Sequence, residues 1–468
     1  KYAMADLLYF QKDWAKCGPA FDSVVQENPQ APEAAEAAYA AVLCYQKMYD
    51  QLHKGDSDKQ GKGLTPTRES QKGGSAKSEW EKFKPKDFTP MQQGMITAFN
   101  RYVCYIQPPA GDKKAEEQYV EVKYARARTY FEAQHWSEAA IAFRDIALNY
   151  PDKDASIYAA QLYLEALNVV GSKNEPPKPA CFDEMAKDVP KFIDLYCKAD
   201  KYTENKENCD LMTRIQCDIR RLAAEKTVEL ADSGGAAEGA LETYKKGGDA
   251  YIAIWRDYGE GPLERGEASQ CGKMDEVLYN AAQAYQAGRL LAKAIAVRRI
   301  MLNPKYNLQE SELAKKSIYQ IGGNYQAIAV YDQAAAFFMR YAEETKYKGE
   351  FADTAIQDAV LLNLGLGKDE EALSASEAFS ENFGRRKPRQ AAQIAFAIAS
   401  HYAEKDEWKE VSKRLSAALP LIDREATLDV KVQAHALLGR AYSKEKDGKA
   451  STEYGKVVGA WKAGAIVV

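Results

Sequence analysis

Apolar residues recur at helical spacing along most of the chain, and two windows repeat the same order of residues at an offset of 122 positions (136 − 14). The first window contains Trp14, Cys17, Phe21 and Pro29, and the second contains Trp136, Ala139, Phe143 and Pro151. Each window predicts a helix, a tight turn and a second helix that ends at the proline, because proline cannot continue the hydrogen-bond ladder. We expect Ala127 and Ala139 to let the two helices approach closely, with Trp136 and Phe143 between them.

Similar units continue downstream. Residues 321–341 and 437–457 each place a glycine three positions before a tyrosine, and weaker units run over 279–304, 361–379 and 402–418. The pattern resembles the tetratricopeptide repeat (TPR) family, whose unit of about 34 residues pairs small and aromatic residues on two helices before a closing proline. The resemblance covers about two-thirds of the chain and implies an all-α fold, an α-α superhelix or TPR-like solenoid of helix-turn-helix repeats.

Two stretches interrupt the repeats. Residues 51–90 are polar and rich in glycine and lysine, so we predict a long mobile insertion, either a disordered surface loop or a segment that orders when it binds a partner. Residues 172–272 carry dense turn signals and several cysteines. We therefore predict an N-terminal TPR-like block at 1–171, a Cys-rich helical connector at 172–272 and a C-terminal TPR-like block at 273–468.

The eight cysteines suggest specific pairs. With a turn near residue 30, Cys17 lies 13 residues before it and Cys44 lies 14 residues after it, so both stand about 20 Å along antiparallel helices. The equivalent positions of the second window, Ala139 and Ala166, are both small. We predict a Cys17–Cys44 disulfide, and two buried free thiols are the alternative.

Five of the remaining cysteines lie in the connector, and four of them suggest pairs. Cys197 and Cys209 flank a polar turn and form a second candidate disulfide, and Cys181 with Cys217 would then form an outer bridge. Connectivity among several cysteines is not fixed by sequence alone. If such bridges form, the protein matures outside the reducing cytosol.

Composition and motifs exclude several function classes. The 64 Lys+Arg and 68 Asp+Glu residues give a net charge of −4, which argues against nucleic-acid binding through overall positive charge. No apolar run approaches the roughly 18 residues of a membrane span, so we expect no transmembrane segment. The histidines lack metal-ligand spacing, and phosphate-loop, dinucleotide and nucleophile-elbow motifs are absent. We therefore expect no metal, no cofactor and no catalytic residue.

One basic run has two interpretations. Arg385-Arg386-Lys387-Pro388-Arg389 lies between two predicted helices. It is either a solvated loop or an anionic docking site.

A second resemblance concerns location. The exit Asn149-Tyr150-Pro151-Asp152, followed by an alanine-rich helix, is similar to bacterial envelope repeat proteins typified by the outer-membrane-assembly lipoprotein. Together with the predicted disulfides, it places the protein in the periplasm or cell envelope. We expect Lys1 to be a processed or trimmed start.

The resemblances imply a function. They indicate a non-enzymatic scaffold for protein partners in an envelope assembly, secretion or motility complex, reaching the outer membrane only through those partners. The TPR resemblance places partner-binding side chains on the concave first helices: Tyr124, Arg128, Phe131, Tyr319, Gln326, Arg440 and Lys444. Their aromatic and basic character suits a peptide carrying carboxylates. The alternatives are a cell-wall (peptidoglycan) enzyme or its substrate-binding subunit built on a helical superhelix, and a fragment of a larger repeat protein.

Overall fold

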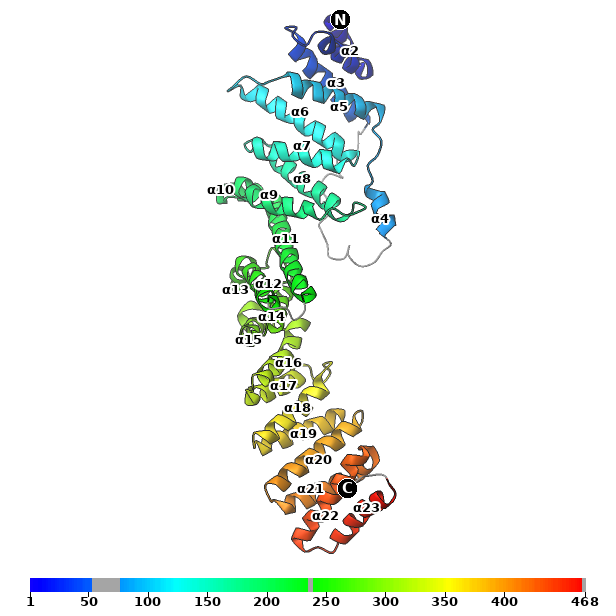
Figure 1. Ribbon diagram of the computed structural model, residues 1–468. Helices are drawn as coiled ribbons and strands as arrows, with labels where there is room; N and C mark the ends of the chain where they lie inside the picture. The colour runs from blue at the N-terminus through cyan, green and yellow to red at the C-terminus, as the bar shows by residue number, and fades with distance from the viewer. Residues whose placement is uncertain (53–75, 235–238, 465–468) are drawn as a thin grey trace. The chain divides into compact units, whose positions relative to one another are not determined.

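The computed structural model describes residues 1–52, 76–234 and 239–464, and all regular secondary structure in these ranges is helical. The chain forms two compact units, Lys1–Leu222 and Ala223–Val468. Within each unit, helices stack in chain order (Figure 1). The predicted all-α repeat fold is confirmed.

The first unit is a series of antiparallel helices in which neighbours along the chain pack together. Its helices are α1 (Tyr2–Phe10), α2 (Trp14–Glu27), α3 (Ala34–Leu52), α4 (Ala76–Phe83), α5 (Pro90–Tyr105), α6 (Lys113–Glu132), α7 (Trp136–Asn149), α8 (Ala155–Ser172), α9 (Ala180–Tyr196), α10 (Ala199–Tyr202) and the first part of α11 (Lys206–Ser233). The offset of 122 residues holds at both ends of the repeated second helix, because α2 and α7 each span 14 residues from a tryptophan.

The second unit alternates first and second helices in the manner of a TPR-like solenoid. It contains the rest of α11, α12 (Ala240–Trp255), the π-helical turn η3 (Arg256–Glu260), α13 (Gly261–Glu264), α14 (Met274–Ala287), α15 (Leu291–Met301), the 3-10 turn η4 (Pro304–Tyr306), α16 (Glu312–Ala327), α17 (Tyr331–Glu344), α18 (Ala352–Gly365), α19 (Asp369–Phe383), α20 (Pro388–Glu404), α21 (Trp408–Glu425), α22 (Leu428–Glu445) and α23 (Ala450–Lys462). Helices α14 to α23 pair as hairpins, and the first helices also touch their successors at α14–α16, α18–α20 and α20–α22.

Six hairpins share one turn. In each, the residue two positions before the second helix has a positive φ; these residues are Lys12, Gln134, Arg289, Ala329, Gly367 and Asp406. The next residue donates its backbone N–H to the carbonyl five positions back, as Val330 does to Tyr325 at 2.9 Å. This is the Schellman motif that ends many helices. Only Gly367 is the glycine that the left-handed conformation favours, so sequence inspection does not reveal the turn.

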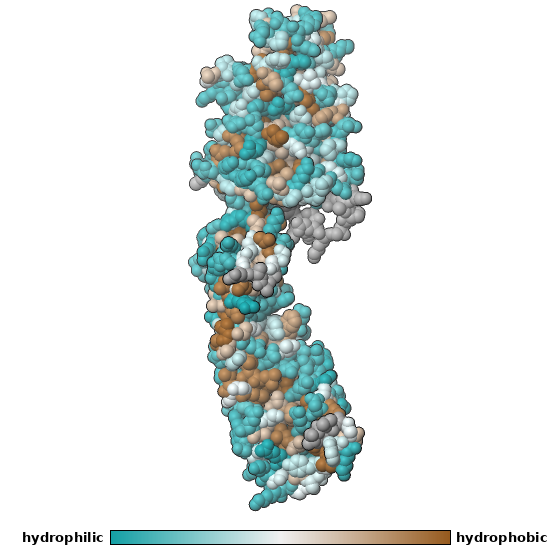
Figure 2. All heavy atoms as spheres, viewed as in Figure 1, coloured by the Kyte–Doolittle hydropathy of each residue, from teal (hydrophilic) through white to brown (hydrophobic). Residues whose placement is uncertain are grey.

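The core of the first unit contains the predicted packing residues. Phe143, Ala139 and Ala127 are fully buried. The Trp136 ring lies 4.9 Å from the ring of Phe131. The face seen in Figure 2 is largely hydrophilic, with apolar patches on both units.

A buried carboxylate ties three helices of the first unit together. Asp188 on α9 is 0% exposed and accepts hydrogen bonds from Arg144 Nε on α7 at 2.6 Å and from the Tyr163 hydroxyl on α8 at 2.8 Å. Arg144 Nη2 and Lys191 Nζ donate two more bonds, at 3.2 and 2.9 Å. Burial alone raises the pKa of this carboxyl, but the hydrogen bonds outweigh burial and lower the pKa to about 2.

Part of the predicted insertion at 51–90 is attached to the first unit. Residues 53–75 lie outside the described residues. At the end of α4, the Phe83 carbonyl accepts a hydrogen bond from Trp136 Nε1 at 2.7 Å, and beyond the helix the Phe88 ring stacks on His135 at 4.2 Å. The loop expected up to residue 90 therefore ends earlier. Individual contacts to the α6–α7 turn hold this segment in place, and it has no periodic apolar face that the sequence could reveal.

The structure joins two of the predicted cysteine pairs. Cys17 on α2 and Cys44 on α3 form a disulfide with Cα atoms 6.0 Å apart, and both are fully buried. Cys197 at the end of α9 and Cys209 on α11 form another, with Cα atoms 5.6 Å apart.

The predicted Cys181–Cys217 bridge is wrong. Cys181 is a free cysteine, whereas Cys217 and Cys271 are both disulfide-bonded. Cys181 lies 16 residues before Cys197 (197 − 181), but Cys217 lies only 8 residues after Cys209 (217 − 209). On helices rising 1.5 Å per residue they stand about 24 Å and about 12 Å from the inner pair, too far apart in height to bond.

Candidate partner-binding site

The predicted residues of the first unit mostly pack inside the α6–α7 hairpin. Tyr124 lies with its ring 5.5 Å from that of Phe143, and Phe131 contacts Trp136. Arg128 Nη2 donates to Glu132 Oε1 at 2.8 Å, and the other oxygen of Glu132 accepts from the Tyr49 hydroxyl at 2.8 Å. The two aromatic residues stabilise the hairpin, and Arg128 belongs to a polar link between α6 and α3.

The predicted residues of the second unit lie on different hairpins. Tyr319 on α16 stacks on Phe351 at 4.9 Å, whereas Gln326 near the end of α16 is exposed. Arg440 and Lys444 on α22 both flank the indole of Trp408, at 5.0 and 5.8 Å from the ring centre. Of the predicted residues of the second unit, the structure brings Arg440 and Lys444 together, in cation–π contact with one ring.

A polar centre between α14 and α16 was not predicted. Arg298 on α15 is fully buried, and every acceptor of its hydrogen bonds is a neutral amide. Its Nε donates to Gln320 Oε1 at 3.1 Å and its Nη1 to Asn324 Oδ1 at 2.5 Å. Its Nη2 donates to Gln283 Oε1 at 2.6 Å and Gln286 Oε1 at 2.9 Å. We call Arg298 and these four amides the amide site.

The amide site leaves its positive charge without a counter-ion. Within the described ranges, no aspartate or glutamate bonds to the Arg298 guanidinium. Burial lowers the pKa of Arg298 to about 10, so the group stays protonated at neutral pH. A buried charge held only by dipoles acts strongly on its surroundings, because the interior screens it little.

The four amides accept hydrogen bonds from the guanidinium through their oxygens and present their NH₂ donors on the other side. Because their oxygens face the guanidinium, their NH₂ groups point away from it. Asn324 and Gln320 donate to Gln286 Oε1 and to the Tyr279 hydroxyl, at 3.0 and 2.9 Å. The NH₂ groups of Gln283 and Gln286 make no hydrogen bond to any described residue, and Gln286 is exposed.

The donors share one face of α14. Tyr279, Gln283 and Gln286 are spaced i, i+4 and i+7, so they line one side of the helix. The Tyr279 hydroxyl accepts from Gln320 and keeps its own hydrogen for an outside acceptor. This face can bind carbonyl or carboxylate oxygens.

The amide site includes a helix that carries two of the predicted partner-binding residues. Tyr319 and Gln326 on α16 stay predictions, and Gln320 and Asn324 of the same helix belong to the amide site. Two signals were available: the polar row on α14, and one arginine at a core position of α15.

In the described part of the chain, no group of three or more His, Cys, Asp or Glu side chains comes together as a metal site. None of the described helices has both the length and the apolar character needed to cross a bilayer.

Comparison with known proteins gives low similarity. No family model and no curated protein matches the chain. One similar solved structure is a signal transduction ATPase (STAND) protein with a tetratricopeptide repeat sensor from Pyrococcus horikoshii, with 11% identity, 90% of this chain and 71% of that chain covered, and a TM-score of 0.33. Another is a Rap protein complexed with competence and sporulation factor, with 13% identity, 74% and 98% covered, and a TM-score of 0.24. The order and contacts of its own helices make this chain a TPR-like helical-repeat protein.

Proposed function

We propose that this protein is a non-enzymatic scaffold that binds protein partners in a bacterial cell envelope. The observation that carries the proposal is the α14 donor row above the buried charge of Arg298. Helical-repeat proteins use such faces of their first helices to hold extended segments of other proteins.

The chemistry of the amide site supports an extended protein segment as the partner. Amide NH₂ groups and a phenol donate to carbonyl oxygens of an extended backbone, and the cation behind them favours carboxylate side chains. An acidic, extended segment therefore fits this face better than a basic one.

The cysteines support the location. Six of the eight cysteines are disulfide-bonded, namely Cys17, Cys44, Cys197, Cys209, Cys217 and Cys271. Structural disulfides persist in oxidising compartments and are rare in the cytosol. The similarity of the Tyr150-Pro151 exit to envelope repeat proteins agrees with this location.

Site-specific photocrosslinking tests the proposal. A photoreactive amino acid at position 286 in living cells should crosslink to an envelope protein, whereas the same group at Gln93, an exposed glutamine of the first unit, should not. In protein without the photoreactive group, Gln286→Glu should weaken binding of the partner that the crosslink identifies, since it places a carboxylate against an acidic segment, and Gln93→Glu should leave that binding unchanged. Crosslinks only to cytosolic proteins, or equal crosslinks from both positions, would contradict the proposal.

A further inference from the structure

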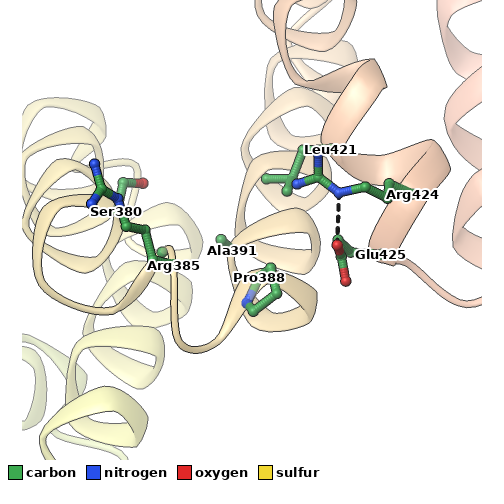
Figure 3. A pocket seen from close by; sticks show the side chains of 8 residues that line it. Ser380, Arg385, Pro388, Ala391, Leu421, Arg424 and Glu425 are labelled. Atoms are coloured by element: carbon green, nitrogen blue, oxygen red, sulfur yellow. Dashed lines mark hydrogen bonds and ion pairs between the residues drawn. The ribbon is translucent and has the colours of Figure 1, made fainter.

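A cavity of about 480 Å³ opens in the second unit, away from the amide site. It lies between the α19–α20 turn and the end of α21 (Figure 3). The side chains of Arg385 and Arg424 come from opposite walls, and Glu425 lies below Arg424 in this view. No residue of this cavity belongs to the amide site.

The charged side chains of the basic run at 385–389 differ in whether they have a partner. Lys387 Nζ pairs with Asp353 Oδ2 at 3.0 Å. Arg386 donates to the Asn382 carbonyl at 3.0 Å and lies over the Phe383 ring. Arg385, which lines the cavity, forms no hydrogen bond or ion pair with any residue that the structure describes. The run is therefore more than a uniformly solvated loop.

The opposite wall carries a second cation that is only partly neutralised. Arg424 Nε donates to Glu425 Oε1 at 2.7 Å, and the Arg424 side chain is 70% exposed. The ionised groups that line the cavity are Arg385, Arg424 and Glu425, two cations and one anion. The cavity thus keeps a net positive charge.

Helix α20 adds to this potential. It begins with Pro388, and its N-cap residue Lys387 makes no side-chain capping bond. The positive end of the helix dipole therefore faces the cavity at Pro388 and Ala391. These two residues and Leu421 form an apolar part of the lining.

We propose that this cavity is a second docking site, which binds an acidic side chain next to an apolar one on an extended segment of a partner protein. The carboxylate binds the Arg424 guanidinium beside Leu421, and Arg385, whose side chain is turned towards Ser380 in Figure 3, reaches it from the opposite wall by a change of rotamer. The apolar neighbour covers Leu421 and Pro388. A small inorganic anion would leave that apolar surface exposed, which favours a peptide.

Peptide binding to the purified full-length chain tests this site. The probe is a fluorescein-labelled Gly/Ser decapeptide with a central Glu-Leu pair, followed by fluorescence anisotropy at low salt. We expect Arg385→Ala and Arg424→Ala each to raise Kd roughly tenfold, the loss expected for a charge-assisted hydrogen bond. Glu425→Gln should lower Kd, since it removes the carboxylate that competes with the ligand.

The controls separate a site from general charge attraction. Arg340→Ala removes an exposed arginine that pairs with Glu344 on α17, and it should not change Kd. The Gln-Leu and Glu-Ser peptides should both bind more weakly than the Glu-Leu peptide. The proposal is overturned if the Glu-Leu and Gln-Leu peptides bind equally, if Arg340→Ala costs as much as Arg385→Ala, or if inorganic phosphate binds there and the peptide does not. Gln286→Glu should leave this binding intact, so the two proposals can fail separately.

Discussion

Two adjacent glycines on α16 are expected to respond to alanine in opposite directions. A Cβ atom on Gly322 would lie 2.6 Å from Cδ1 and 2.7 Å from Cε1 of Phe338. Phe338 is 1% exposed, and its ring lies 5.4 Å from that of Tyr319, so it has little room to move. On Gly323, a Cβ would meet no described atom within 4 Å.

The magnitudes follow from two opposing effects. Alanine is favoured over glycine in a helix interior by roughly 0.8–1.0 kcal/mol, so Gly323→Ala should raise the free energy of unfolding by about that much. At Gly322 the same gain is opposed by overpacking, which costs about 1–3 kcal/mol. We expect Gly322→Ala to lower the free energy of unfolding by about 1 kcal/mol, leaving the two variants about 1–3 kcal/mol apart.

Urea unfolding of the full chain, followed by circular dichroism, measures this difference. The chain has two units, which can unfold in separate transitions. The transition to compare is that of the second unit, which contains both glycines and which both variants shift. Adding Phe338→Leu to Gly322→Ala should recover part of the loss, since the smaller side chain makes room for the methyl group. A Gly322→Ala variant as stable as Gly323→Ala would refute the packing argument.

Three further predictions concern stability. Replacing Cys17 and Cys44 together by alanine should lower the free energy of unfolding by about 3–4 kcal/mol, and the difference from the parent should vanish when both are fully reduced. Because the pKa of Asp188 is depressed, its contribution to the free energy of unfolding is present above about pH 4 and is lost as the pH falls towards 2. Asp188→Asn should therefore make the melting temperature depend less on pH across that window. In the hairpin turns, Ala329→Gly should raise and Gly367→Ala should lower the free energy of unfolding by roughly 1 kcal/mol, and thermal melts showing shifts of the same sign would contradict the left-handed assignment.

Much of the fold was accessible from sequence because its determinants are local or repeated. The matched tryptophans at positions 14 and 136 begin helices of equal length. The heights of Cys17 and Cys44 along an antiparallel pair follow from helix rise alone.

The rest depends on relations that a single sequence does not show. The Schellman turns use Ala329 and Arg289 where glycine would be the visible signal. The amide site assembles from three helices around Arg298, and its neutral partners give no charge pattern to recognise. Phe88 is held by ring contacts with His135 and Tyr130, which no periodicity could reveal.

The repeated hairpin also provides an internal reference for redox chemistry. The α2–α3 interface contains the Cys17–Cys44 bond, whereas the α7–α8 interface has Ala139 and Ala166 at the equivalent positions, both fully buried. Native-state hydrogen exchange can compare the two interfaces in one sample before and after reduction. A loss of protection confined to α2 and α3 would measure how much of their rigidity comes from the covalent link and how much from helix packing alone.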